Sequence, residues 1–148
     1  MIDRELLPLA LLYAEDREEI QGRTRLQKLV FLTQNESAQA EERLPGKYNY
    51  VPYDYGPFAR DLYDDLDRLK SRKVIVEDPE KMEDGKIKYD YRLGPQADEY
   101  LAQVPKEKFE ATLELAQKIK STWNGKELPD LLDYVYSEYP NYAENSVL

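Results

Sequence analysis

The stretch GRTRLQKLVFLTQ, residues 22–34, decides how this chain folds. Thr24 and Gln27 stand three positions apart near its start, a spacing that predicts a capping box, in which each side chain bonds the backbone N–H of the other residue. From Leu26 onward apolar side chains occupy nearly every side of the expected helix, so several neighbouring elements should cover it. The sequence therefore predicts a buried central helix.

The first turn of this helix is basic. Arg23, Arg25 and Lys28 lie near the positive end of the helix dipole, where acidic side chains are favoured. One interpretation is an anion site, in which helix N–H groups and the cations receive a phosphate or a partner's carboxylate. The preferred alternative is internal ion pairing, because the surface charges of an acidic protein usually find neighbours in the same chain. The acids within reach are Asp16, Glu18, Glu19 and the aspartates of the third expected helix.

The composition narrows the classes of function. The chain has 148 residues, a formal net charge of −9, 13 tyrosines, and neither histidine nor cysteine. Its length fits one domain with a hydrophobic core. The missing side chains exclude disulfides, thiolate nucleophiles, zinc–thiolate sites and imidazole bases. The start has no signal-peptide pattern, and the apolar run 6–14 is too short to span a membrane. We expect a soluble cytoplasmic protein.

Shorter patterns flank the central helix. A first helix is expected from Asp3 to Ala14, followed by a polar link over residues 15–22 and, after the central helix, a turn at Pro45-Gly46. The run YNYVPYDY, residues 48–55, is typical of an edge strand or an ordered loop, because its proline cannot donate to a sheet.

A third helix is expected to begin at Pro57, because proline at the first helical position loses no hydrogen bond. Its inward stripe is Phe58, Leu62, Leu66 and Leu69. Its outward face carries four aspartates and two arginines: Arg60, Asp61, Asp64, Asp65, Asp67 and Arg68.

Residues 74–77 and 86–93 predict a β-hairpin, since apolar and polar residues alternate strictly in the second strand. Further helices are expected over 97–104, 105–123 and 128–139. The order helix, helix, helix, hairpin predicts a mainly α fold with a small antiparallel hairpin, in the α+β class. We expect a winged-helix-like domain over residues 1–104, and a C-terminal helical extension over 105–148 packed on it as one compact unit.

Three patterns carry a resemblance to a known family: GRTRLQKLVFL at 22–32, YDYGPF at 53–58 followed by DLYDDLDRL, and the wing-like hairpin. In this order they resemble the YwgA-like proteins of bacteria and archaea and, more distantly, the Panacea domain of SocA-like antitoxins. The resemblance covers roughly residues 1–104, with a weaker likeness in the final tyrosine-rich helix. Its signature maps to Gly22, Arg23, Thr24, Leu26, Gln27, Lys28, Tyr55, Gly56, Pro57 and Phe58. It implies a protein without enzymatic activity that grips a partner protein, as antitoxins and proteolytic adaptors do.

The candidate partner-binding residues are Arg23, Arg25, Lys28, Tyr50, Tyr53 and Tyr55. Tyrosine offers a large amphipathic contact area and is enriched in interfaces. The alternative is that the tyrosines of residues 48–55 cover the core with their hydroxyls in water. No catalytic, cofactor or metal site is expected, because the aspartates of the third helix bring at most two carboxylates together and lie in no calcium-loop pattern.

Function hypotheses from three classes remain. A protein-binding adaptor or antitoxin-like module is favoured over a DNA-binding transcriptional regulator, because the third helix and the hairpin loop are rich in acids that phosphates would repel. A metal-dependent nuclease is the least favoured hypothesis. Asp78 with Asp84-Gly85-Lys86 resembles a nuclease motif in which two acids and a lysine bind a metal, but the same residues suit a hairpin turn. The apolar stripes within residues 105–139 also suggest a homodimer formed through the C-terminal helices. The alternative is a monomer in which both helices fold back over the N-terminal domain.

Overall fold

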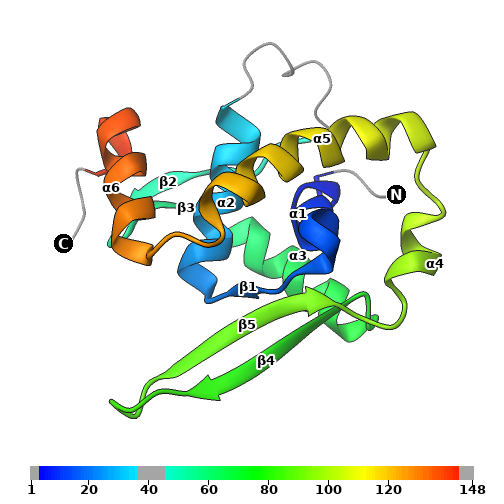
Figure 1. Cartoon of the computed structure of the whole chain (residues 1–148), viewed down its shortest axis with the longest axis horizontal. Helices are drawn as coiled ribbons and strands as arrows, with labels where there is room; N and C mark the ends of the chain where they lie inside the picture. Colours follow the sequence, from blue (N-terminus) through cyan, green and yellow to red (C-terminus); the bar gives the residue numbers. More distant parts are fainter. Residues whose placement is uncertain (1–3, 37–45, 144–148) are drawn as a thin grey trace.

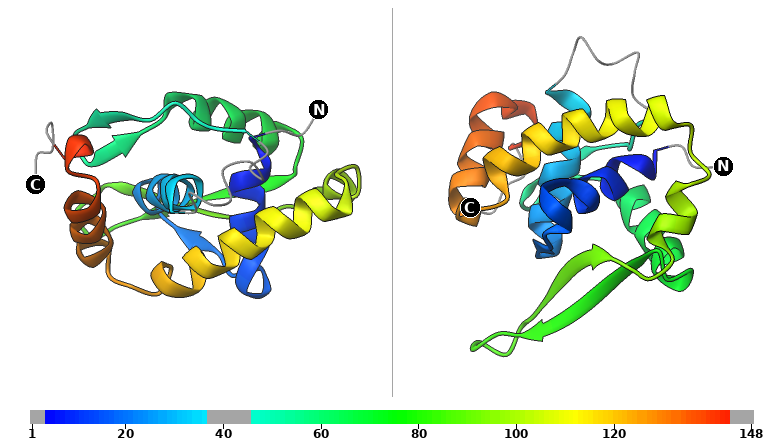
Figure 2. Two further views of the ribbon diagram at one scale, coloured as in Figure 1. Left: turned by 90° about the horizontal axis from the view of Figure 1, so that it is seen from above. Right: turned by 45° about the vertical axis from the view of Figure 1, so that its right-hand side comes forward.

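Helix α2 (Arg23–Asn35) is the centre of the structure, a computed structural model that describes residues 4–36 and 46–143. In the left view of Figure 2 it is seen nearly end-on, ringed by the other helices and by strands. Every residue from Leu26 to Thr33 is buried, including the polar Gln27 and Lys28. The prediction of a buried central helix is confirmed.

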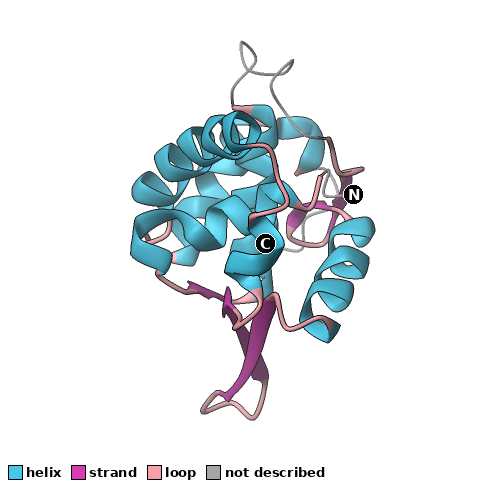
Figure 3. Cartoon of the chain, turned by 90° about the vertical axis from the view of Figure 1, so that its right-hand side faces the viewer, coloured by secondary structure: helices cyan, strands magenta, loops and turns pink. Residues whose placement is uncertain are grey.

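Helices and two small antiparallel sheets surround α2, which confirms the predicted α+β class (Figures 1 and 3). Helix α1 (Leu6–Arg17) and strand β1 (Ile20–Gln21) precede it. The elements that follow it are β2 (Val51–Tyr53), β3 (Gly56–Phe58), α3 (Arg60–Ser71), β4 (Ile75–Lys81), β5 (Ile87–Leu93), α4 (Ala97–Leu101), α5 (Lys106–Trp123), α6 (Leu128–Glu138) and the 3-10 helix η2 (Pro140–Tyr142).

The larger sheet has the strand order β1-β5-β4, with all neighbours antiparallel. Strands β4 and β5 form the predicted hairpin, here called the long hairpin, whose outer half projects from the helical body (Figure 3). Strand β1 lies in what the sequence predicts as a polar link, and its buried Ile20 stands opposite Tyr91. The short hairpin is β2 paired with β3, where Val51 stands opposite Phe58.

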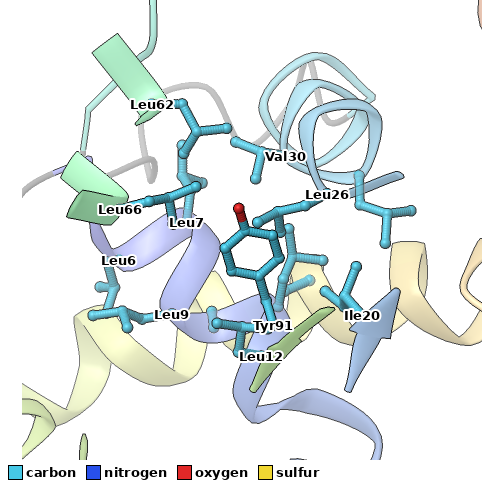
Figure 4. Packing of buried hydrophobic residues seen from close by; sticks show 14 of the residues in the cluster. Leu6, Leu7, Leu9, Leu12, Ile20, Leu26, Val30, Leu62, Leu66 and Tyr91 are labelled. Atoms are coloured by element: carbon cyan, nitrogen blue, oxygen red, sulfur yellow. The ribbon is translucent and has the colours of Figure 1, made fainter. Parts of the chain in front are cut away.

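The core lies between α1, α2, α3 and the inner half of the larger sheet, and buried residues of α4, α5 and α6 complete it. Figure 4 shows leucines of α1 packed with Leu26 and Val30 of α2, Leu62 and Leu66 of α3, and the ring of Tyr91. Six of the seven residues from Leu6 to Leu12 are core hydrophobics without exposed surface, the exception being the buried Pro8. Burying a leucine contributes about 1.5–3 kcal/mol, so α1 contributes much of the stability.

The predicted capping box of Thr24 and Gln27 is wrong. The N-cap of α2 is Gly22, which has φ +93° and makes no side-chain cap. Its N–H donates to the carbonyl oxygen of Tyr89 at 2.9 Å, so the chain enters α2 directly from the sheet. Glycine tolerates this positive φ. The side chain of Gln27 bonds the backbone of Ala59 and not that of Thr24.

The predicted start of the third helix at Pro57 is also wrong, because residues 56–58 form β3 and α3 begins at Arg60. Gly56 has φ +91°, and a Cβ there would lie 2.7 Å from Cε1 of Tyr136, so the hairpin needs glycine at this place. The expected outward face needs a correction too: Asp65 is fully buried, bonded to the side chains of Arg4 and Tyr48.

The ends of the first helix differ from the expectation in detail. Its expected cap, Asp3, lies outside the described residues, as does Pro45 of the expected turn. The described helix begins at Leu6, and its backbone leaves the helical region at Ala14, where the sequence places its end. Glu15, Asp16 and Arg17 then have positive φ.

The C-terminal helices cover the remaining sides of α2. Helix α5 packs along α1 and reaches α2, while α6 contacts α2 and β3. The apolar stripe of α6, with Leu131, Leu132 and Val135, is buried within the same chain. The homodimer and the division of the chain after residue 104 stay predictions.

Candidate partner-binding site

The three cations at the start of α2 point to three different places. The guanidinium of Arg23 lies 4.1 Å from the ring centroid of Tyr89 and donates from Nε to the hydroxyl of Tyr91 at 3.1 Å. Arg25 donates to the carbonyl oxygen of Trp123 at 3.2 Å. Lys28 turns inward and donates to the carbonyl oxygen of Pro57 at 3.1 Å. The basic turn therefore does not form a single anion site.

The hydrogen-bond and ion-pair partners of Arg23 and Arg25 differ from those that the sequence suggests. The acid beside Arg23 is Glu77 of β4, at 3.4 Å, and not an acid of residues 15–19. Arg25 lines a polar cavity of about 410 Å³ between β1 and the end of α5, where burial lowers its pKa from the usual value.

Two glutamines of α2 hold the segment 48–59 at both of its ends. The side chain of Gln34 donates to the carbonyl oxygen of Tyr48 at 3.0 Å and accepts from its N–H at 2.8 Å. Gln27 bonds the backbone of Ala59 in the same way, at 3.0 and 3.3 Å. Each amide thus satisfies a donor and an acceptor of the segment. The short hairpin is therefore fixed to the central helix α2.

The tyrosines of this segment divide between core and surface. Tyr48 is buried, and Tyr50 packs edge-on against Phe31 while its hydroxyl donates to the carbonyl oxygen of Gln27 at 3.1 Å. Tyr53 and Tyr55 are 53% and 46% exposed. Of the candidate tyrosines, Tyr50 therefore belongs to the core, and the other two are available at the surface.

An aromatic row connects the short hairpin to the long one. The ring of Tyr53 stacks on Phe58 with centroids 4.9 Å apart, and Phe58 meets Tyr63 of α3 edge-on at 5.4 Å. Arg23 then lies between Tyr63 and Tyr89, 5.4 and 4.1 Å from their ring centroids. Cation–π contacts of this kind stabilise the row.

This row borders a pocket of about 230 Å³ that joins three separate parts of the sequence. In Figure 1 the short hairpin lies beside α2, on the side of α6. The pocket, here called the aromatic pocket, is lined by Thr24, Gln27, Lys28, Tyr53, Tyr55, Gly56, Phe58 and Tyr63. Sequence reasoning missed Tyr63 and the surface role of Phe58, because it assigned Phe58 to the inward stripe of a helix that begins later.

Lys28, one of the residues that line the aromatic pocket, is a buried cation. The residue is only 3% exposed, and burial lowers the pKa of its ammonium to about 8. Within the described residues, no carboxylate forms an ion pair with it. At neutral pH most molecules still carry this charge. A buried ammonium with one carbonyl partner is costly and attracts an anion.

The other motifs of the sequence serve the fold. Asp78 pairs with Arg92 across the long hairpin, and Asp84 accepts from the N–H of Lys86 at 2.9 Å within the turn. In the described part of the chain, no group of three or more acidic side chains could hold a metal ion. Among the described helices, none combines the length and the hydrophobicity that a membrane span requires.

Comparison with known proteins gives one family. The model of the family described as antitoxin SocA-like, Panacea domain, matches residues 26–146. No curated protein matches the chain. The match confirms the SocA-like part of the resemblance. It extends through α5 and α6, whereas the sequence indicated a likeness over residues 1–104 and a weaker one in the final helix. The likeness to YwgA-like proteins stays a prediction.

Proposed function

The chain belongs to the family of SocA-like antitoxins with a Panacea domain, and on this premise we propose that it acts without catalysis, by binding a partner protein. The binding surface consists of the short hairpin and the aromatic pocket. Among the residues predicted from the sequence, Tyr53, Tyr55 and Lys28 belong to it. Arg23 supports it from the side, while Arg25 and Tyr50 lie outside it.

One observation carries this proposal: large apolar side chains are exposed next to the pocket. Val51, Tyr53 and Tyr55 are 52%, 53% and 46% exposed on a single short hairpin. Isolated exposed residues are ordinary, but a patch beside a pocket marks a binding surface. Tyrosine contributes much contact area at little entropic cost.

The surface is also held in place before any partner arrives. Gln27 and Gln34 fix both ends of the segment that carries the hairpin, and Gly56 lets it pass close to Tyr136. A rigid surface loses less conformational entropy on binding. This arrangement suits a protein whose function is recognition.

A DNA-binding regulator is the second candidate, because three helices, α1, α2 and α3, precede the long hairpin, the order that led us to expect a winged-helix-like domain. The charges favour a protein partner. The outer half of the long hairpin carries Glu80, Glu83 and Asp84 against Lys81, Lys86 and Lys88, so neither sign dominates there. DNA binding draws much of its affinity from a surplus of cations. With Asp65 buried, the exposed acids of α3 are Asp64 and Asp67. Its exposed cations are Arg60, Arg68 and Lys70, of which Arg68 and Lys70 already pair with acids of the same chain.

The proposal is tested by capturing partners from cells that encode this chain. The baits are the wild type, the variant Tyr53→Ser/Tyr55→Ser, and a control variant Lys106→Ala/Glu110→Ala. The control pair is exposed at the end of α5 away from the short hairpin (Figure 1). Each captured protein is then expressed in a second host with each bait, and growth is followed.

We expect the wild type and the control to capture a protein that arrests growth when expressed alone, and to relieve that arrest. The hairpin variant should lose both effects, because truncating two central aromatic contacts costs about 2 kcal/mol or more each in typical interfaces. Equal capture and equal relief by all baits would contradict the proposed surface.

A further inference from the structure

We propose that the aromatic pocket receives the side chain of an aspartate or glutamate from the partner protein, whose carboxylate pairs with the ammonium of Lys28. This inference rests on the proposed function for the class of partner. It adds the chemistry that the partner must present.

The first argument is the incomplete set of partners around Lys28. Its ammonium has three N–H donors, and the described structure gives it one acceptor, the carbonyl oxygen of Pro57. The other buried lysine, Lys120, differs because it donates to two carbonyl oxygens where α1 ends, those of Ala14 and Glu18. Lys120 therefore closes the end of a helix, whereas Lys28 lines a pocket and keeps donors for a ligand.

The second argument is the absence of a competing acid. Arg23 lies near an acid of its own chain, Glu77, and the described residues place no such group on Lys28. Burial is the cause of the lowered pKa of Lys28, with no nearby carboxylate to oppose it. An incoming carboxylate would regain the interaction that the ammonium lost on leaving water.

The third argument is size and shape. Pockets for drug-sized molecules are about 300–1,000 Å³, and this one is about 230 Å³. It accepts one side chain rather than a cofactor. The rings of Tyr53, Phe58 and Tyr63 offer apolar walls for the methylene groups, and Thr24 is a polar residue of the same lining.

The fourth argument distinguishes a protein side chain from other carboxylates and from phosphate. The exposed apolar rim extends past the pocket along the hairpin to Val51. A small anion would leave this rim uncovered, and a chain terminus would end at the pocket. A side chain in the middle of a segment lets the partner continue over the rim.

The test uses two short peptides and the full chain. The probes are acetyl-Leu-Glu-Leu-amide and acetyl-Leu-Gln-Leu-amide, titrated to about 10 mM because a single anchor gives only millimolar affinity. Binding is followed by nuclear magnetic resonance of the Lys28 side chain and of the backbone over residues 51–63. We expect the glutamate peptide to bind at least about fivefold more tightly, since its hydrogen bonds are charge-assisted. It should also raise the pKa of Lys28.

The matched variant is Lys28→Met, which keeps the length of the side chain and removes its charge. It should bind both peptides equally. If this variant does not fold, the comparison of the two peptides on the wild type still decides. Equal binding of both peptides, or no response at Lys28, would overturn the inference.

Two further probes separate other sources of the anion. Acetyl-Leu-Leu with a free terminal carboxylate, or inorganic phosphate, should bind more weakly than the glutamate peptide. Equal or tighter binding of either would overturn the inference in favour of a chain terminus or a free anion. A partner that needs Tyr53 and Tyr55 but is indifferent to Lys28→Met would leave the proposed function standing and reject this inference alone.

Discussion

The side-chain amide of Gln27 forms two hydrogen bonds with the backbone of Ala59, donating to its carbonyl oxygen at 3.0 Å and accepting from its N–H at 3.3 Å. Both residues are buried. Ala59 lies between the short hairpin and α3, so this pair joins the central helix α2 to the segment that forms the aromatic pocket. The bonds between Gln27 and Ala59 thus link the stability of the core to the geometry of the aromatic pocket.

Replacing Gln27 by leucine should therefore destabilise the protein by about 2–4 kcal/mol, because a buried donor and a buried acceptor of Ala59 would both lose their partners. Urea denaturation measures the change. The exposed Gln103 provides the matched control, since leucine there should alter the unfolding free energy by less than about 0.5 kcal/mol. Equal stability of the two variants would show that the bonds to Ala59 contribute little.

The start of α2 gives a second prediction: Gly22 should contribute more to stability than Thr24. Gly22→Ala should cost about 1–2 kcal/mol, because a residue with a side chain is strained at φ +93°. Thr24→Ala should change stability by less than about 0.5 kcal/mol, since Thr24 is not the cap of the helix. The same denaturation measurement applies to both. A larger effect at Thr24 than at Gly22 would restore the capping box that the sequence suggests.

The lowered pKa of Lys28 predicts a dependence of stability on pH. Its value in the folded state, about 8, is below the 10.5 of the free side chain. Between these values the unfolded chain binds more protons, so the free energy of unfolding should rise as the pH increases above 8. Lys120, also with a pKa of about 8, adds to this rise.

Lys28→Met should remove one part of that rise, up to about 1.4 kcal/mol per pH unit. Urea denaturation at pH 7.5, 8.5 and 9.5 measures this part of the rise below the pH at which tyrosines ionise. Burial raises the pKa of Tyr91 above the usual value of a tyrosine. The ionisation of such tyrosines therefore opposes the rise in unfolding free energy only near pH 10 and above. Parallel curves for the wild type and the variant would contradict the buried charge.

The charge distribution predicts that the protein does not bind duplex DNA tightly at physiological salt. Electrophoretic shifts with genomic fragments should show no complex at submicromolar protein. Incubation of the same fragments with magnesium or manganese should leave them intact, because Asp78 and Asp84 are engaged in the long hairpin. A competitor-resistant shift would favour the regulator, and cleavage that Asp84→Ala abolishes would favour the nuclease.

Patterns within one element were predictable from the sequence. The apolar run of α2 indicated burial on all sides, and the alternation from Ile87 to Leu93 indicated a strand, because both signals depend on local periodicity. Strand β1 was missed since it has only two residues, and its pairing partner, β5, lies about 70 residues later in the sequence. Gly22 was missed as the cap for the same reason, because its bond to Tyr89 is a tertiary contact.

The candidate site was predictable only in part. Tyr53, Tyr55 and Lys28 were named, but their meeting in one pocket depends on how the short hairpin folds against α2. The divergence of Arg23 from the other two cations was within reach, because residues two and five positions apart on a helix point in different directions. Arg25 and Lys28 are three positions apart and share a face, so only their tertiary partners, Trp123 and Pro57, separate them. Asp65 looked like a surface acid until Arg4 and Tyr48, from distant segments, enclosed it.

Hydrogen–deuterium exchange on the complex with a captured partner tests the central claim most directly. The account predicts slower exchange over the backbone of residues 51–63 in the complex, with little change along the exposed face of α5. Protection confined to α5 and α6, with residues 51–63 exchanging as in the free protein, would contradict binding at the short hairpin and the aromatic pocket.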